Sequence, residues 1–334
     1  MEQRTGRLYD KVLGCLLGGE IGDAMGAPAE GKTYREIAET YGELTDFSGF
    51  GTDDSALKHI LCDAIAHTGG YPTADAWAGE WLAQEDLFLK RRLFWIPVMN
   101  GFWKIRGEGI APRQAGEGNM ASSSSAMCIS PLGIINAANP RQAALETYEV
   151  ASPIHHNYCR DAACSMAAAV AAAFHPDASA ESVVSAALDC LPPLSARVMR
   201  EYLGGTVALA REAGGYALFR ERYYAERILP GSAMPDSRET VPVALSLFLL
   251  AGGDPRETIL YGANFGRDAD TIASMAGALA GAFCGASALP QAWVDKVRAE
   301  SPRAHSAVAE QLVNVIARRT ADLSAQIDAV ERLL

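Results

Sequence analysis

GCLLGGEIGDAMG, residues 14–26, repeats glycine at every fourth position from Gly14 to Gly26. Glycine inside a helix costs roughly 0.5–1 kcal/mol relative to alanine, so a ridge of glycines requires a compensating interaction. Very close approach of two helix backbones supplies one. Glycine returns at the same spacing from Gly277 to Gly285. We therefore expect both segments to be crowded helices at the centre of the fold.

Helical periodicity dominates the rest of the chain, and no segment shows the convincing alternation of a strand. Apolar or alanine-rich runs predict helices over residues 55–66, 141–151, 158–174, 180–190, 195–211 and 239–250. The last ~30 residues predict one long or once-broken closing helix. No charge block or low-complexity tract divides the chain, so we expect residues 1–334 to form one compact all-α domain of many helices.

The composition excludes some functions. Hydrophobic residues make up 49% and charged residues 21%, as in globular proteins. Lysine and arginine number 29 against 40 acidic residues, which gives a net charge of −11. Such a surface repels phosphate groups, so we expect no general binding to nucleic acid or to anionic membranes. Residues 272–289 lack charge, but they are mostly small residues between an acidic cluster and Pro290, which favours a buried helix over a membrane span.

The cysteines and the N-terminus favour the cytoplasm. Seven cysteines without a C-x-x-C pair argue against a disulfide framework and against a zinc knuckle. The first residues are polar and are not followed by an apolar run with a cleavage site, so we expect no signal peptide. A reducing compartment fits both features.

Two acidic clusters, each at the start of a predicted helix, carry the chemistry. Residues 51–55 read GTDDS, and residues 266–271 read GRDADT. For either cluster alone, capping of free amide hydrogens is the simpler interpretation. Together they offer four carboxylates and two threonine hydroxyls, which are the hard oxygen ligands of Mg²⁺, Mn²⁺ or Ca²⁺. If the helix starts meet, the set suffices for a two-metal centre, in which Asp270 could bridge ions about 3.5–4 Å apart.

With these motifs the sequence resembles the ADP-ribosylglycohydrolase family. The resemblance rests on the first glycine ridge with Asp23 and Glu30, on both acidic clusters, and on the small-residue helix after the second cluster. It implies an all-α fold that holds two Mg²⁺ ions, or Mn²⁺ in some members. It also implies hydrolysis of the glycosidic bond at C1″ of an ADP-ribosyl group. The metal ligands that it implies are Thr52, Asp53 and Asp54 for the first ion, Asp270 shared, and Asp268 and Thr271 for the second.

The resemblance also points to substrate-binding residues. Glu30 matches a family glutamate beside the metals and the ribose, although a surface glutamate after a turn fits its spacing equally. Asp23 is more readily structural, because it lies between glycines of the crowded helix. The segments 116–125 and 152–156 match family stretches that face the substrate. The substrate-binding candidates in them are Gly118, Asn119, Ser122, Ser123 and His155.

These candidates also have ordinary interpretations, and one position departs from the family. Four consecutive serines, Ser122 to Ser125, form a flexible polar loop in most proteins. A histidine beside a helix start, such as His155, is more often a capping or packing residue. Many family members have arginine where this chain has Cys128. Loss of that guanidinium removes a partner for an anion, which makes a ribosylated molecule smaller than ADP-ribose a credible substrate.

We therefore predict an enzyme that hydrolyses an N-ribosidic bond through an oxocarbenium-like transition state. Glu30, Asp53 or Asp54 would orient or deprotonate the attacking water. The substrate would be an ADP-ribosylated macromolecule or a ribosylated small molecule. Three alternatives stay open: an N-glycosidase of a small nucleoside, nucleotide or NAD-derived metabolite, a two-metal phosphohydrolase, and a non-catalytic ADP-ribose-binding protein.

Overall fold

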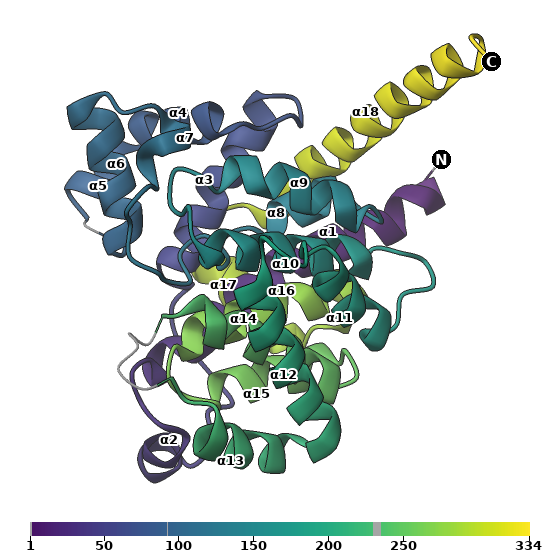
Figure 1. The fold of residues 1–334 in the computed structure, drawn as a ribbon. Helices are drawn as coiled ribbons and strands as arrows, with labels where there is room; N and C mark the ends of the chain where they lie inside the picture. The colour runs from purple at the N-terminus through teal and green to yellow at the C-terminus, as the bar shows by residue number, and fades with distance from the viewer. Residues whose placement is uncertain (1, 92, 230–234) are drawn as a thin grey trace.

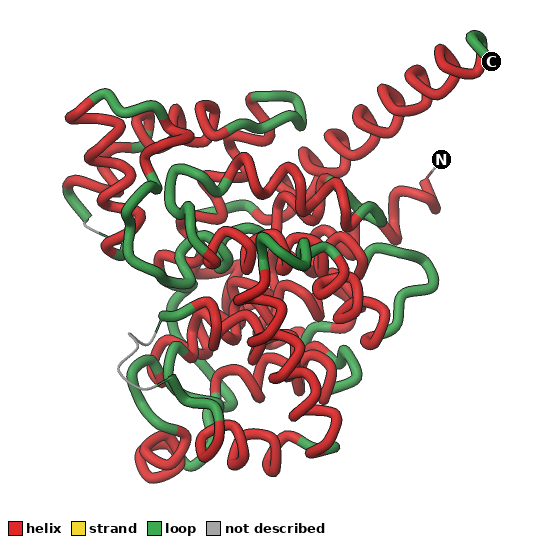
Figure 2. Tube along the Cα trace, in the orientation of Figure 1, coloured by secondary structure: helices red, strands yellow, loops and turns green. Residues whose placement is uncertain are grey.

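The computed structural model describes residues 2–91, 93–229 and 235–334, with side chains from Gly6 onward. These residues form eighteen α-helices and two short 3-10 helices, without a β-strand, so the predicted all-α class is confirmed (Figures 1 and 2). In chain order the helices are α1 (Glu2–Gly26), η1 (Ala27–Ala29), α2 (Tyr34–Tyr41), α3 (Asp53–His67), α4 (Ala74–Ala83), α5 (Glu85–Leu89), α6 (Ile96–Glu108), α7 (Pro112–Ala115), α8 (Ser130–Ile135), α9 (Pro140–Val150), α10 (Tyr158–Ala173), α11 (Ala180–Asp189), α12 (Arg197–Ala213), α13 (Tyr216–Glu226), α14 (Ser237–Leu250), α15 (Pro255–Ala263), α16 (Ala269–Cys284), η2 (Ala286–Ala288), α17 (Gln291–Glu300) and α18 (His305–Glu331).

The two glycine-rich helices, α1 and α16, pack against each other at the centre of the fold. A Cβ atom added to Gly18 would lie 2.3 Å from the carbonyl oxygen of Gly277. One added to Gly281 would lie 1.9 Å from the carbonyl oxygen of Gly14. Cβ atoms do not approach other atoms so closely, so this helix separation requires glycine. The predicted crowding is confirmed.

The remaining core grows around this pair. All residues of α16 from Ala269 to Ala282 are buried, as expected for a core helix. The main hydrophobic cluster runs from Val12 to Val315 and joins residues from most of the helices, which confirms a single compact fold. No helix of the described residues combines the length and the apolar character that crossing a membrane requires. The predicted helices correspond to α3, α9, α10, α11, α12 and α14, with ends that agree within two residues.

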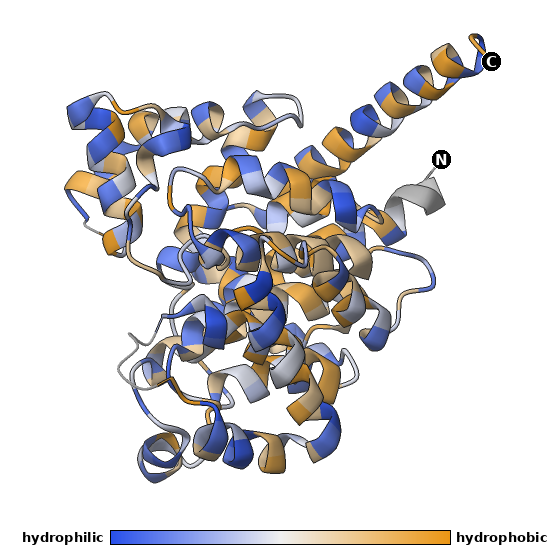
Figure 3. Ribbon diagram, viewed as in Figure 1, coloured by the Kyte–Doolittle hydropathy of each residue, from blue (hydrophilic) through white to orange (hydrophobic). Residues whose placement is uncertain are grey.

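The closing helix, α18, is continuous, so of the two predicted forms, one long helix or a once-broken one, the structure has the first. It begins inside the fold, where His305 is buried, and its C-terminal half leaves the body of the molecule (Figure 1). Leu323 and Ile327 on this projecting part are exposed. The ribbon of the same part has both hydrophobic and hydrophilic residues along its length (Figure 3).

Candidate metal centre and active site

The two acidic clusters meet because α1 and α16 pack so closely. A Cβ atom on Gly26, at the end of α1, would lie 2.4 Å from Cα of Asp270 in the first turn of α16. The Thr271 hydroxyl donates a hydrogen bond of 3.2 Å to Oδ2 of Asp54 in the first turn of α3. The starts of α3 and α16 therefore lie together at the end of α1, as the sequence led us to expect.

The residues at this junction line a cavity of about 230 Å³. Seven predicted site residues line it, namely Glu30, Asp53, Asp54, Ser123, Asp268, Asp270 and Thr271. Ser124, from the segment 116–125 expected to face the substrate, also lines it. The remaining lining residues were not named as site candidates from the sequence, and they are Leu93, Phe94, Trp95, Met127 and Pro235. Trp95 is 43% exposed, so an aromatic face remains free beside the carboxylates.

Buried carboxylates give the cavity an unusual charge balance. Burial raises the pKa of Asp53 to about 6, and repulsion from Asp23 adds to the effect. Burial likewise raises the pKa of Asp268 to about 7. The pKa values of Asp54 and Asp270 lie well above the ordinary value, because burial and neighbouring carboxylates both disfavour their ionised forms. A divalent cation would reverse this balance, since it favours the ionised form of each carboxylate.

Two groups of carboxylate oxygens could each hold such a cation. Oxygens of Asp23, Asp54 and Asp270 lie within 4.8 Å of one another, and the same holds for Glu30, Asp268 and Asp270. Asp270 belongs to both groups. Asp54 Oδ1 and Asp270 Oδ1 are buried and find no hydrogen-bond partner among the described residues. Buried oxygens without a donor are rare, so these residues fit the hard-oxygen coordination of Mg²⁺ or Mn²⁺.

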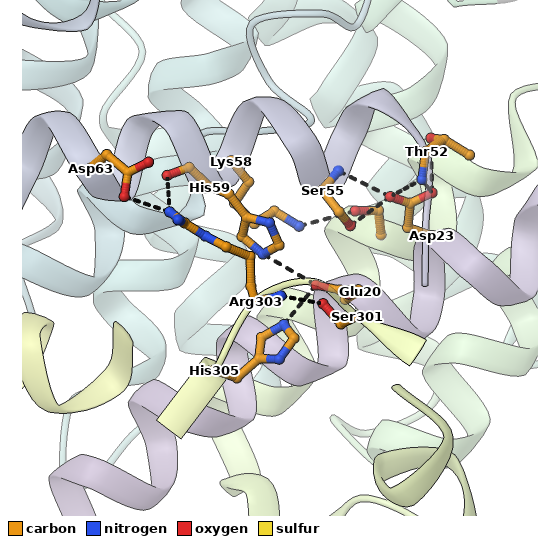
Figure 4. Close-up of polar contacts among 11 residues, drawn as sticks. Glu20, Asp23, Thr52, Ser55, Lys58, His59, Asp63, Ser301, Arg303 and His305 are labelled. Atoms are coloured by element: carbon orange, nitrogen blue, oxygen red, sulfur yellow. Dashed lines mark hydrogen bonds and ion pairs between the residues drawn. The ribbon is translucent and has the colours of Figure 1, made fainter. Parts of the chain in front are cut away.

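Asp23 is held differently from Asp54 and Asp270. Thr52 donates hydrogen bonds to it from its backbone N–H and its hydroxyl, and Ser55 does the same (Figure 4). Both carboxylate oxygens of Asp23 are thus occupied. Asp23 fixes the loop that leads into α3, which is the structural role expected of it. The hydroxyl of Thr52 points to Asp23, and Thr52 does not line the cavity.

Backbone contact between the segment after η1 and the loop before α16 places Glu30 near Asp268. The N–H of Gly31 donates to the carbonyl oxygen of Arg267 at 2.8 Å. Arg267 has a φ of 65°, which is uncommon for a residue with a side chain. Its guanidinium forms an ion pair of 2.8 Å with buried Glu239, which holds this turn in place. Sequence reasoning missed Glu239, because nothing in its neighbourhood along the chain indicates an arginine partner.

The serine segment is buried and forms one wall of the site. All four residues from Ser122 to Ser125 are buried, which disagrees with the ordinary interpretation of this segment as a flexible polar loop. Ser123 donates a hydrogen bond of 3.0 Å to Oδ2 of Asp268. Ser122 and Ser125 lie 3.3 and 2.8 Å from the two ring nitrogens of His155. His155 does not line the cavity, and burial lowers its pKa to about 4.

The other substrate-binding candidates lie outside the cavity lining. Gly118 is exposed, with a φ of 73°. The Asn119 side chain donates hydrogen bonds to the carbonyl oxygens of Pro97 and Ile154. These bonds fix the loop, and they use the amide group that would otherwise be available to a substrate. Cys128 is buried, and burial raises the pKa of its thiol. The roles of Gly118 and Asn119 in substrate binding stay predictions.

Comparison with known proteins identifies the family. Residues 4–323 match the ADP-ribosylglycohydrolase family, and the chain belongs to it. The protein is therefore a hydrolase that acts on glycosyl bonds, and its family supports substrates linked through ADP-ribose.

Relatives of known name match most of the length of this chain at low sequence identity. An ADP-ribosyl-[dinitrogen reductase] glycohydrolase of Rhodospirillum rubrum is 25% identical over 307 residues, which are 87% of this chain and 91% of the relative. The ADP-ribosylarginine hydrolase Tri1 of Pseudomonas putida (strain GB-1) is 24% identical over 341 residues, covering 97% of this chain and 81% of the relative. A solved structure of an ADP-ribosylglycohydrolase-related protein complex matches with a TM-score of 0.68 at 21% identity, and the match covers 93% of this chain and 98% of that one. This similarity shows a shared fold.

Proposed function

We propose that this chain hydrolyses the N-glycosidic bond at the ribose anomeric carbon of an ADP-ribosylated or related ribosylated substrate, with two Mg²⁺ ions in the cavity. One observation carries the proposal: Asp54 Oδ1 and Asp270 Oδ1 are buried without hydrogen-bond partners. They belong to two groups of oxygens that share Asp270. Such oxygens are suited to bind cations, and a shared carboxylate supports a pair of them.

The proposed ligands follow the family motif. They are Thr52, Asp53 and Asp54 for the first ion, Asp270 for both, and Asp268 and Thr271 for the second. Mn²⁺ would suit the same oxygens. When bound, the ions would supply Lewis acidity that polarises a water and orients the ribose hydroxyls. Ser123 holds one oxygen of Asp268 through its hydrogen bond, which leaves the other oxygen for a ligand role.

The acid and base steps are assigned to groups at the cavity. Glu30 is an exposed residue on the cavity lining, so its carboxylate could orient the attacking water and accept its proton. The water oxygen bonds to the anomeric carbon as the bond from that carbon to nitrogen breaks. The leaving nitrogen takes a proton from solvent. We do not assign this proton to His155, because its ring nitrogens contact Ser122 and Ser125 behind the cavity wall.

The size of the cavity favours recognition of the ribosyl end. Its volume of about 230 Å³ is below the ~300–1,000 Å³ typical of pockets that enclose a whole ligand. Cys128 stands where the resemblance to the family implies an arginine, so this chain lacks a cationic partner for a diphosphate at that position. These two observations support, as a second candidate, an N-glycosidase of a small nucleoside, nucleotide or NAD-derived metabolite. The odd number of cysteines supports action in the cytoplasm, and the continuous core supports one domain over residues 1–334.

The proposal can be tested by identifying the bond that breaks. Purified protein with Mg²⁺ or Mn²⁺ is incubated with ADP-ribosylarginine, ADP-ribosylated protein, NAD and simple nucleosides, and mass spectrometry reads the products. Release of the free amine or base, with transfer of ¹⁸O from water to the ribose carbon, is the expected result. Release of phosphate or AMP would instead establish a phosphohydrolase. Binding of ADP-ribose with no turnover of any substrate would establish a binding protein.

Variants connect the reaction to the cavity. Asp270→Asn should abolish turnover and weaken Mg²⁺ binding, because this residue belongs to both groups of oxygens. Glu30→Gln should lower kcat and weaken Mg²⁺ binding only at the group formed by Glu30, Asp268 and Asp270, while the group formed by Asp23, Asp54 and Asp270 keeps its ligands. Asp86→Asn is the matched control, since Asp86 is exposed and its ion-pair partner among the described residues is Lys90, four positions along the chain. Wild-type activity in Asp270→Asn would refute the assignment of the site.

A further inference from the structure

A second cluster of metal-ligating side chains lies outside the cavity. Glu20 belongs to α1, His59 to α3, and His305 is the first residue of α18. One ligand atom from each of the three lies within 4.8 Å of the other two. Figure 4 shows the two imidazole rings turned toward the Glu20 carboxylate. None of these residues lines the acidic cavity.

The geometry presents two imidazole nitrogens to one carboxylate oxygen. Nε2 of His305 lies 2.6 Å from Oε2 of Glu20, and Nε2 of His59 lies 3.2 Å from the same oxygen. The ring centroids are 5.6 Å apart, with their planes at 65°. Ligand atoms of a tetrahedral zinc ion are about 3.3 Å apart, as follows from metal–ligand distances near 2.0–2.1 Å. The Glu20 and His59 ligand atoms are 3.2 Å apart, close to this separation, and His305 would have to move away from Glu20 by less than about 1 Å to reach it.

Two buried polar atoms of the cluster have no hydrogen-bond partner among the described residues. The Glu20 side chain is fully buried, and its Oε1 has no hydrogen-bond partner among the described residues. The same is true of Nδ1 of His305. Although burial raises the pKa of Glu20, hydrogen bonds from His305 and His59 outweigh this effect and lower it to about 2. Glu20 is thus a buried anion whose ion-pair partners, among the described residues, are the two histidines alone.

We propose that Glu20, His59 and His305 form a binding site for a divalent transition-metal ion of the zinc class. One carboxylate and two imidazoles are a common donor set for Zn²⁺, whereas Mg²⁺ prefers oxygen ligands alone. The His59 side chain is 12% exposed, which gives the ion a path from solvent. The ion would neutralise Glu20 and join α18 to α1 and α3. The site is independent of the proposed hydrolytic reaction.

The test measures zinc binding in a protein whose acidic cavity is weakened, because Asp270 belongs to both of its groups of oxygens. Metal-free protein carrying Asp270→Asn is titrated with Zn²⁺ in a zinc buffer, and with Co²⁺, whose visible absorption reports imidazole ligation. We expect about one equivalent of tightly bound ion and a rise in Tm with added Zn²⁺. Adding His59→Gln should weaken binding about tenfold or more and remove the Co²⁺ absorption. Because His59 is partly exposed, this variant should keep its fold, which circular dichroism checks.

A second histidine variant serves as the matched control. His67→Gln, also made with Asp270→Asn, removes an exposed histidine that pairs with Glu80, and it should bind Zn²⁺ with unchanged affinity. Absence of tight Zn²⁺ binding in the Asp270→Asn protein would overturn the proposal. So would equal affinity with and without His59→Gln, since the ion would then lie elsewhere. Neither result depends on whether the protein hydrolyses a ribosylated substrate.

Discussion

Adding one methyl group between α1 and α16 tests whether backbone contact holds the centre of the fold. A Cβ atom on Gly18 would lie 2.3 Å from the carbonyl oxygen of Gly277, where ordinary contact begins near 3.4 Å. The obstacle is the backbone of a buried helix, so no side-chain rotation can relieve it. Gly18→Ala therefore forces the two helices apart locally by about 1 Å, which is the difference between these distances.

The expected loss of stability follows from two opposing effects. Overpacking of a core costs about 1–3 kcal/mol, and a backbone obstacle puts this substitution at the upper end of that range. Alanine restores about 1 kcal/mol of helix propensity relative to glycine. We therefore expect the free energy of unfolding to fall by about 2 kcal/mol. Separation of the helices should also weaken Mg²⁺ binding, because Asp23 and Asp270 lie on the two helices that move apart.

Urea unfolding followed by circular dichroism measures the effect, and Gly79→Ala provides the control. Gly79 lies within α4, and a Cβ atom added there meets no other atom within 4 Å. This control should gain up to about 1 kcal/mol from helix propensity alone. If Gly18→Ala were as stable as Gly79→Ala, the close packing of α1 and α16 would not be required for stability. Our explanation of the glycine ridge would then fail.

Three further predictions concern the cavity. The folded protein raises the pKa of Asp53 to about 6 and that of Asp268 to about 7, so both carboxyls stay protonated at pH values where they ionise in the unfolded chain. The stability that these two protonated carboxyls contribute is therefore lost as the pH rises through their folded-state pKa values. Mg²⁺ should therefore bind more tightly, and raise Tm more, at about pH 8 than at about pH 5.5; calorimetry showing equal affinity would contradict this. Asp23→Asn should weaken Mg²⁺ binding about 10–100-fold with unchanged helix content, because an amide cannot accept all the hydrogen bonds from Thr52 and Ser55. Trp95→Ala should raise KM for a ribosylated substrate and leave Mg²⁺ affinity unchanged, since the hydrogen bond from Trp95 to Asp53 comes from the backbone N–H, which alanine keeps. Weaker Mg²⁺ binding would show that the indole positions the ligands.

The sequence predicts those parts of the fold in which local pattern and packing agree. Glycine at every fourth position indicates a face where two backbones touch, and α1 and α16 have that face. Short helices such as α7 were not predicted, because four residues carry no periodicity and neighbouring segments determine their conformation. Helix α2 could have been found, since Thr33 and Glu36 form a capping box that is readable in the sequence.

Prediction of the site succeeds for residues with distinctive chemistry and fails where long-range contacts decide. Runs of aspartate at two helix starts indicate a shared cation site even when they are far apart in the chain. Trp95 was not assigned to the cavity, because an aromatic side chain at helical spacing is more often core. The burial of Ser123 is likewise invisible locally, since its hydrogen bond to Asp268 spans 145 positions.

The glycine ridge and the acidic cluster are two parts of one physical arrangement. Carboxylates with raised pKa values repel one another, and in a yielding scaffold they would move apart or remain protonated. Here Asp23 and Asp270 belong to helices in direct backbone contact, so the carboxylates cannot separate without loss of core packing. Packing energy thus keeps the oxygens together before a cation arrives. Cation binding then does not have to supply the free energy that would bring the carboxylates together. A preformed site therefore binds its cation more tightly than a site that must first assemble.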